Sequence, residues 1–214
     1  MTFSIVARDP RNGLLGVATA TAGPAVGALV PHGRANVGAI ATQAMTNPYL
    51  ALDCLTHLPT TPAPQAMDAA LERDPDRQRR QFIVVDHNGD TAGWTGTACD
   101  SFAGHLAADG VAVAGNIIAG AAVLEAMLTI YEDEDDAPFE QRLLAAMVAG
   151  ERAGGDTRGT GSAAIKIYDQ EAFAAIDLRV DWSEAPLQSL SALLDRTTTG
   201  SYAHFFGTIP RRYA

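Results

Sequence analysis

The sequence predicts an α+β fold in which two stacked antiparallel sheets lie between layers of helices, a four-layer α/β/β/α sandwich. Three observations lead to this prediction. Strand-like segments come in hairpins, pairs of helical segments interrupt them twice, and no linker or composition shift divides the 214 residues. Sheets built of hairpins bury one face against each other, and amphipathic helices cover the remaining faces. We therefore expect one domain over residues 1–214.

The strands are predicted where β-branched and aromatic residues gather between turn signals. Asp9 to Gly13 supplies turn residues that join the first two strands into a hairpin, and Asn88-Gly89 joins a later pair. The run Pro31-His32-Gly33 is expected to break the chain before the third strand. In chain order, the predicted strands cover residues 2–8, 14–21, 37–45, 80–86, 91–97, 104–107, 111–115, 162–168 and 174–180.

The helices are predicted from capping residues and helical spacing of apolar positions. Asn47 is a favourable N-cap before Pro48, and Thr61-Pro62 repeats this arrangement. Gly154-Gly155 ends the fourth helix. The predicted helices cover residues 48–55, 62–71, 121–131, 139–152 and 186–194, and residues 201–214 are expected to form an irregular tail.

Charge and missing signals exclude several classes of function. The 15 basic residues against 25 acidic ones give a formal net charge of -10, which disfavours binding to nucleic-acid phosphates. Cys54 and Cys99 lack the spacing of a zinc site or a disulfide framework. Neither a signal peptide nor a membrane span is recognisable. We expect a cytoplasmic protein that acts on a small-molecule substrate without nucleic acid, membrane, metal or other cofactor.

Thr2 is the candidate nucleophile. Cleavage after Met1 would leave a threonine whose α-amine, with an ordinary pKa of about 7.7–8.0, can accept the proton of its own hydroxyl. The first strand of a hairpin would hold this hydroxyl rigidly. Threonine after methionine is also common without catalytic meaning, so position alone leaves both interpretations open.

Asn116, Asp156 and Arg158 are further candidates. Asn116 closes a strand, where its amide would face a developing oxyanion or simply cap the strand end. Asp156 and Arg158 lie in a glycine-rich loop, where Asp156 would orient Arg158 toward a substrate carboxylate or the pair would only hold the turn. The same loop imitates a dinucleotide fingerprint, but it follows a helix and opens a strand, the reverse of the required order.

Several motifs together resemble a known family. They are Thr2-Phe-Ser-Ile-Val-Ala-Arg-Asp9, Leu15-Gly-Val-Ala18, Gly33-Arg-Ala-Asn-Val-Gly-Ala-Ile-Ala-Thr-Gln43, Arg79-Arg-Gln-Phe-Ile-Val-Val-Asp86, Trp94-Thr-Gly-Thr-Ala-Cys99, Gly115-Asn116, and Gly154-Gly-Asp-Thr-Arg-Gly159 followed by Ser162-Ala-Ala. This combination resembles the uncharacterised bacterial domain-of-unknown-function (DUF) 1028 family, which is usually placed among the N-terminal nucleophile (Ntn) hydrolases.

The resemblance implies an α/β/β/α fold and, by analogy with the superfamily, an amidohydrolase in which Thr2 becomes N-terminal. Its implied substrate contains an amide or peptide-like bond. Relatives of this fold commonly associate, so the resemblance is compatible with a homodimer. A fold hosts many functions. The alternative is therefore a non-catalytic member that retains Met1 and keeps the sandwich as a scaffold or for binding a small ligand.

Overall fold

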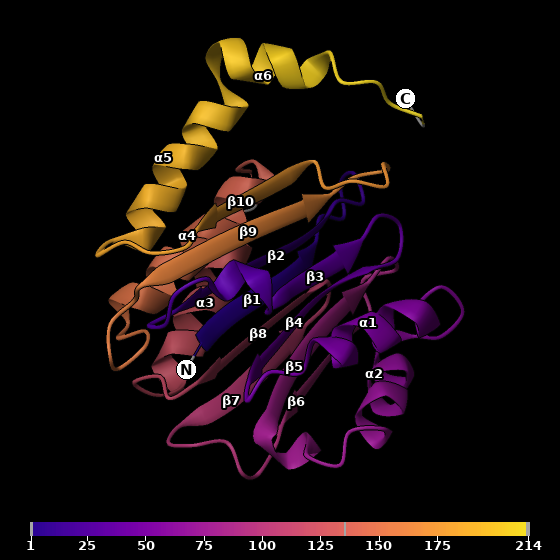
Figure 1. The fold of residues 1–214 in the computed structure, drawn as a ribbon, viewed down its shortest axis with the longest axis vertical. Coiled ribbons are helices and arrows are strands. Elements are labelled where there is room, and N and C mark those ends of the chain that lie inside the picture. Colours follow the sequence, from indigo (N-terminus) through magenta and orange to yellow (C-terminus); the bar gives the residue numbers. More distant parts are fainter. Residues whose placement is uncertain (1, 135, 213–214) are drawn as a thin grey trace.

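The computed structural model describes residues 2–134 and 136–212 and confirms the predicted sandwich of two antiparallel sheets (Figure 1). Within these residues, sheet A has the strand order β10-β9-β2-β1-β8-β7, and sheet B has the order β3-β4-β5-β6. The strands are β1 (Thr2–Arg8), β2 (Leu15–Thr21), β3 (Pro31–Arg34), β4 (Gly38–Ala44), β5 (Arg80–Asp86), β6 (Thr91–Thr95), β7 (Ala103–Ala108), β8 (Val111–Asn116), β9 (Ser162–Tyr168) and β10 (Ile176–Val180).

Helices cover the outer face of each sheet (Figure 1). Two helices pack on sheet B, and three pack on sheet A. Asn47 caps the first of them as predicted, since its side-chain oxygen accepts a hydrogen bond from the Tyr49 N–H at 3.1 Å. The helices are α1 (Pro48–His57) and α2 (Ala63–Glu72) on sheet B, α3 (Ala121–Asp133), α4 (Phe139–Arg152) and α5 (Pro186–Thr198) on sheet A, and α6 (Gly200–Gly207) after α5.

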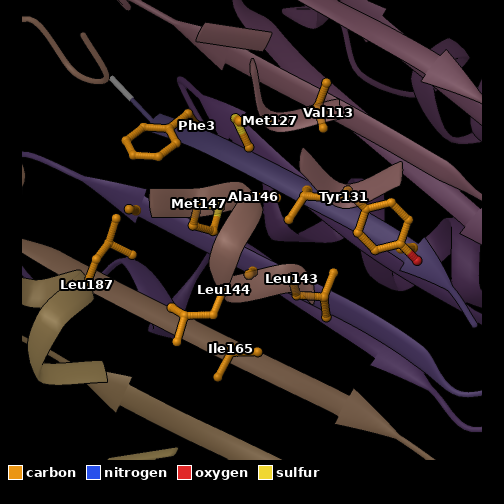
Figure 2. Packing of buried hydrophobic residues seen from close by; sticks show 14 of the residues in the cluster. Phe3, Val113, Met127, Tyr131, Leu143, Leu144, Ala146, Met147, Ile165 and Leu187 are labelled. Atoms are coloured by element: carbon orange, nitrogen blue, oxygen red, sulfur yellow. The ribbon is translucent and has the colours of Figure 1, made fainter. Parts of the chain in front are cut away.

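Strand alternation divides the apolar residues into three cores. On β1, Phe3 and Ile5 face the helices on sheet A, whereas Val6 faces sheet B. Figure 2 shows the first core, where Phe3 and Ile165 of the sheet pack with Met127, Leu143 and Met147 of α3 and α4. The second core joins sheet B to α1 and α2, and the third lies between the sheets. Each sheet is therefore buried on both faces.

The close packing of α4 on sheet A depends on a glycine of β2. A Cβ atom at Gly16 would lie 2.5 Å from Leu143 Cδ1 and 2.7 Å from Phe139 Cε1. Both partner residues belong to α4 and are buried. The helix therefore rests directly on the strand backbone, and it holds the centre of sheet A in place.

The structure corrects two predictions about irregular segments. The expected break at Pro31-His32-Gly33 is strand β3, which is compatible with proline because Pro31 is the first residue of a strand at the sheet edge. The expected irregular tail contains α6, and α5 continues to Thr198. Two glycines lower the helix propensity of α6, but Tyr202, Phe205 and Phe206 have helical spacing. Residues 213–214 of that tail lie outside the described residues.

Smaller differences concern the ends of elements. Strand β6 ends at Thr95 rather than Thr97, and β10 begins at Ile176 rather than residue 174. Helix α2 begins one residue later than expected, where the Ala63 N–H donates to the buried carboxylate of Asp86 at 3.2 Å. Among residues 2–134 and 136–212, no helix combines the length and hydropathy that a transmembrane helix requires.

Candidate functional site

At one end of the sandwich, the residues between the two sheets change from apolar to polar. Strand β1 illustrates the change, because Val6 belongs to the apolar core whereas Ser4 and Thr2 on the same face are buried polar residues. The same change occurs on the neighbouring strands of both sheets. The buried polar side chains at this end are Thr2, Ser4, Thr19, Thr21, Gln43, Gln81, Asn116 and Ser162.

Gln81 connects the two sheets at this polar end. Its Oε1 accepts hydrogen bonds from Gln43 Nε2 at 2.6 Å and from Asn116 Nδ2 at 3.1 Å. Its Nε2 lies 2.9 Å from the carbonyl oxygen of Gly115 and 3.0 Å from that of Gly104. Since Gln81 belongs to sheet B and both glycines belong to sheet A, its side chain fixes the spacing of the sheets.

Thr2 is held by this network through its carbonyl oxygen. Gln43 Nε2 donates to the Thr2 oxygen at 3.2 Å, and Asn116 Nδ2 donates to it at 3.4 Å. The Thr2 hydroxyl donates to Thr21 Oγ1 at 3.3 Å. Thr2 is only 6% exposed, and it pairs with Asn116 in the register of β1 and β8. The backbone and the hydroxyl of Thr2 therefore have separate partners.

Ser4 extends the network along β1. Its Oγ donates to Gln43 Oε1 at 2.5 Å and lies 2.8 Å from Thr19 Oγ1. The side-chain amides of Gln43 and Gln81 thus each accept hydrogen bonds through Oε1 and donate them through Nε2. Buried polar groups are costly without such partners, and a fully satisfied network fixes a single arrangement of side chains.

Backbone strain occurs beside both amides that bind Thr2. Ala44 follows Gln43 and has a φ of 67°, and Ile117 follows Asn116 and has a φ of 51°. These left-handed conformations cost roughly 1–3 kcal/mol each, and they are rare for a β-branched residue such as Ile117. The Ile117 turn is held from outside, because its carbonyl oxygen accepts a hydrogen bond from the Thr157 N–H at 3.3 Å. Strain of this kind concentrates at functional sites.

The network reaches a histidine on its far side. Gln81 Nε2 lies 3.0 Å from Thr95 Oγ1, and this oxygen lies 2.9 Å from His105 Nδ1. Burial lowers the pKa of His105, so the neutral imidazole is favoured. A series of hydrogen bonds leads from Thr2 through Asn116, Gln81 and Thr95 to His105. His105 therefore contacts the polar cluster indirectly.

Asp156 joins two loops next to Thr21. Its carboxylate accepts hydrogen bonds from the Ala22 N–H at 2.8 Å and the Arg158 N–H at 2.9 Å, and its side chain is fully buried. The Arg158 side chain is 53% exposed, and its guanidinium lies 3.5 Å from the same carboxylate. Asp156 thus has a clear structural role in the loop, while the Arg158 side chain is partly exposed to solvent.

Two other kinds of site find little support. Within the described part of the chain, no group of three or more His, Cys, Asp or Glu side chains is arranged to hold a metal ion. Burial raises the pKa of Cys54 to about 12, and burial also raises the pKa of Cys99. A thiolate nucleophile is therefore disfavoured at both positions.

The structure brings Thr2 and Asn116 into one hydrogen-bonded cluster and places Asp156 beside it through Ala22. Neither Gln43 nor Gln81 was predicted to belong to the site. A sequence signal for them exists, because each glutamine shares a strand face with residues of the core between the sheets, Ala39 and Ala41 on β4 and Ile83 and Val85 on β5. A glutamine at such a position requires a polar partner from another strand.

We predict that Gln81→Leu destabilises the protein although leucine is more apolar. The substitution removes the partner of Gln43 and Asn116 and leaves two backbone carbonyls facing a hydrocarbon side chain. Each buried group without a partner costs about 1–3 kcal/mol, so the free energy of unfolding should fall by at least about 2 kcal/mol. Chemical denaturation measures this change.

The control Gln188→Leu, at an exposed position of α5, should change the free energy of unfolding by less than about 0.5 kcal/mol. Equal stability of the two variants would contradict the role of Gln81.

A solved structure of high similarity is among the matches of this chain. The crystal structure of protein SPO2555 from Silicibacter pomeroyi, described with the family model DUF1028, is 32% identical, covers 98% of this chain and 91% of its own, and has a TM-score of 0.92. Anbu (ancestral beta-subunit) from Yersinia bercovieri is 11% identical with a TM-score of 0.42, covering 99% of this chain and 100% of its own. The Anbu (Gly-1) mutant from Hyphomicrobium sp. strain MC1 is 12% identical with a TM-score of 0.46, covering 100% of both chains. TM-scores this low support no conclusion about the present chain.

The remaining comparisons concern families and curated proteins. No curated protein matches the chain. The model of the Family of unknown function (DUF1028) matches residues 2–190, which includes every residue of the polar cluster described above. Together with the close structural match, this assigns the chain: it belongs to the DUF1028 family of unknown function.

Proposed function

We propose that this protein is an N-terminal nucleophile hydrolase that cleaves an amide or peptide-like bond of a small molecule. Thr2 is the nucleophile in this proposal, after cleavage of the peptide bond between Met1 and Thr2. The observation that carries the proposal is the arrangement around Thr2, whose carbonyl oxygen is held by two buried amides while its hydroxyl contacts Thr21. These partners hold the backbone and the hydroxyl of Thr2 in one orientation, and a nucleophile requires such a fixed orientation.

The α-amine of Thr2 serves as the general base. In its neutral form it takes the hydroxyl proton while Oγ1 attacks the substrate carbonyl carbon. The resulting ammonium group then gives this proton to the leaving nitrogen, the C–N bond breaks, and an ester links the acyl group to Thr2. Water attacks this ester with the amine again as base, so that a carboxylic acid leaves and the free hydroxyl returns.

The surrounding amides act in this scheme as positioning groups. Gln43 and Asn116 hold the Thr2 carbonyl, so the Cα atom that carries both the amine and the hydroxyl-bearing side chain stays in a fixed orientation. The predicted role of Asn116 as an oxyanion donor requires more, because its Nδ2 already donates to Thr2 and to Gln81. Asn116 can contribute to the oxyanion only if one of these bonds is exchanged for the substrate.

We predict that a β-lactone acylates Thr2 in protein from which Met1 has been removed, and that peptide mapping by mass spectrometry locates the adduct there. Thr2→Ser should keep the reaction, since serine retains both a hydroxyl and an α-amine, whereas Thr2→Ala should abolish it. The labelling rate should rise with pH through about 7.7–8.0, because only the neutral amine accepts the proton.

The matched control for this experiment is Thr60→Ala, which removes a threonine hydroxyl from an exposed position and should leave labelling unchanged. Undiminished labelling of a folded Thr2→Ala variant would refute the assignment of the nucleophile. Absence of any adduct on a chain that begins at Thr2 would favour the alternative function, a scaffold or ligand-binding protein.

Arg158 is proposed to bind a carboxylate of the substrate. Its side chain is 53% exposed, and Asp156 holds its backbone at the end of the sandwich where Thr21 lies. A guanidinium matches the two oxygens of a carboxylate in a bidentate contact.

We expect Arg158→Gln to slow acylation by a β-lactone that carries a carboxylate by about 10- to 100-fold, which corresponds to the 1.5–3 kcal/mol of a charged hydrogen bond. Acylation by a neutral β-lactone of similar size should be unaffected, since Arg158 has no part in the chemical step. An equal loss for both reagents would show that Arg158 only maintains the loop.

A further inference from the structure

Helix α6 is an apolar helix that buries nothing within its own chain. None of the residues from Thr197 to Ile209 is buried. Tyr202 is 49% exposed and Phe205 is 56% exposed, and both rings lie within 6.2 Å of a neighbouring aromatic ring of the same helix. Figure 1 shows α6 standing apart from sheet A beyond β10. Apolar helix faces normally lie against another element, so this face lacks its counterpart.

Contacts behind its C-terminal end nevertheless hold the helix in place. At its start, Gly200 has a φ of 66° and allows the chain to turn sharply away from α5. Behind its end, the Arg211 guanidinium binds the Asp169 carboxylate, and the Arg212 N–H donates to Glu171 Oε1 at 2.8 Å. Helix α6 therefore forms an arch that returns to the loop before β10, and its exposure is not that of a frayed terminus.

An apolar cleft of about 340 Å³ lies between this arch and sheet A. Ile176 and Leu178 of β10 form one wall, and Tyr202, Ala203 and Phe206 of α6 form the other. Asp177 and Arg211 also line the cleft. Both walls are only partly covered, because Ile176, Leu178, Ala203 and Phe206 each retain intermediate exposure. The aromatic face of α6 and this cleft thus form one continuous surface that is mainly apolar.

The charge distribution indicates what covers this surface. The 14 residues from Thr197 to Pro210 contain no Asp, Glu, Lys or Arg, in a chain whose formal net charge is -10. Two copies of such a chain repel each other over most of their surfaces, and an uncharged segment is where they can approach most closely. A strongly charged partner would instead favour a patch with complementary charges, which this segment lacks.

We propose that α6 and the adjoining cleft are the surface through which two copies of this chain form a symmetric dimer. In a two-fold contact the same patch serves both copies, so the aromatic face of each α6 packs on the α6 and the cleft of the other. The 13 residues from Thr197 to Ile209, together with Ile176 and Leu178 of β10, give about 15 residues per partner, an interface smaller than the standard 20–30 residues. Aromatic residues suit the centre of such a contact.

Sedimentation equilibrium of the full chain tests this proposal. The wild type should sediment as a dimer of twice 22.4 kDa at micromolar concentrations, and the dimer should tighten with added salt because salt screens the repulsion between the copies. The double variant Tyr202→Asp, Phe205→Asp should sediment as a monomer, with a dissociation constant raised at least 100-fold. Its circular dichroism and melting temperature at low concentration should match those of the wild type, since both side chains are exposed in the single chain.

Phe102→Asp is the matched control, because Phe102 is 40% exposed and precedes β7 at the opposite edge of sheet A. This variant should remain dimeric. A wild type that stays monomeric would overturn the proposal, and flotation of that monomer with phospholipid vesicles through Tyr202 and Phe205 would assign the surface to a membrane instead. A dimer that persists in the double variant, or dissociates equally in Phe102→Asp, would place the interface elsewhere.

Discussion

The hydrogen bonds of Gln81 are the constraint on which the end of the sandwich around Thr2 depends. Elsewhere the two sheets are held together by apolar residues such as Val6, Val17 and Ile83. The hydrophobic effect that stabilises these contacts is not directional. At the Thr2 end, one glutamine side chain connects Gln43 and Asn116 with two backbone carbonyls of sheet A. Hydrogen bonds are directional, so this network specifies where each side chain lies as well as how far apart the sheets are.

The remaining layers give this network a rigid support. Strand β1 lies between β2 and β8 near the centre of sheet A, and α3 and α4 cover its outer face. The strained residue Ala44 ends β4 directly after Gln43, and the strained residue Ile117 follows the end of β8 at Asn116. Both strands therefore end where these amides contact Thr2. Core packing elsewhere offsets the cost of this strain. Rigid support of this kind is what a nucleophile requires, because small displacements of reacting atoms lower rates strongly.

Most of the fold follows from local sequence signals, whereas the site follows from them only in part. Hairpin turns, Asn47 as an N-cap and the alternation of β1 predict the strands, the helices and their layers, because these depend on neighbouring residues. Strand β3 was missed because Pro31 is normally a strand breaker, and α6 because glycine weakens its helix signal. Thr2 and Asn116 were predicted from their positions in the chain. Gln81 was not, since its partners Gly104 and Asn116 come from distant strands of the other sheet and the pairing of sheets is non-local.

A nucleophilic Thr2 requires a free α-amine, so the identity of the first residue in the mature protein decides whether Thr2 can have this role. Protein produced without an N-terminal tag should be purified from its native host, and its intact mass and N-terminal peptide should be determined. We expect a chain that begins with Thr2 and carries a free α-amine. A folded protein in which Met1 or any other residue remains attached to the Thr2 nitrogen would contradict it, because the amine that must accept the hydroxyl proton would then be an amide.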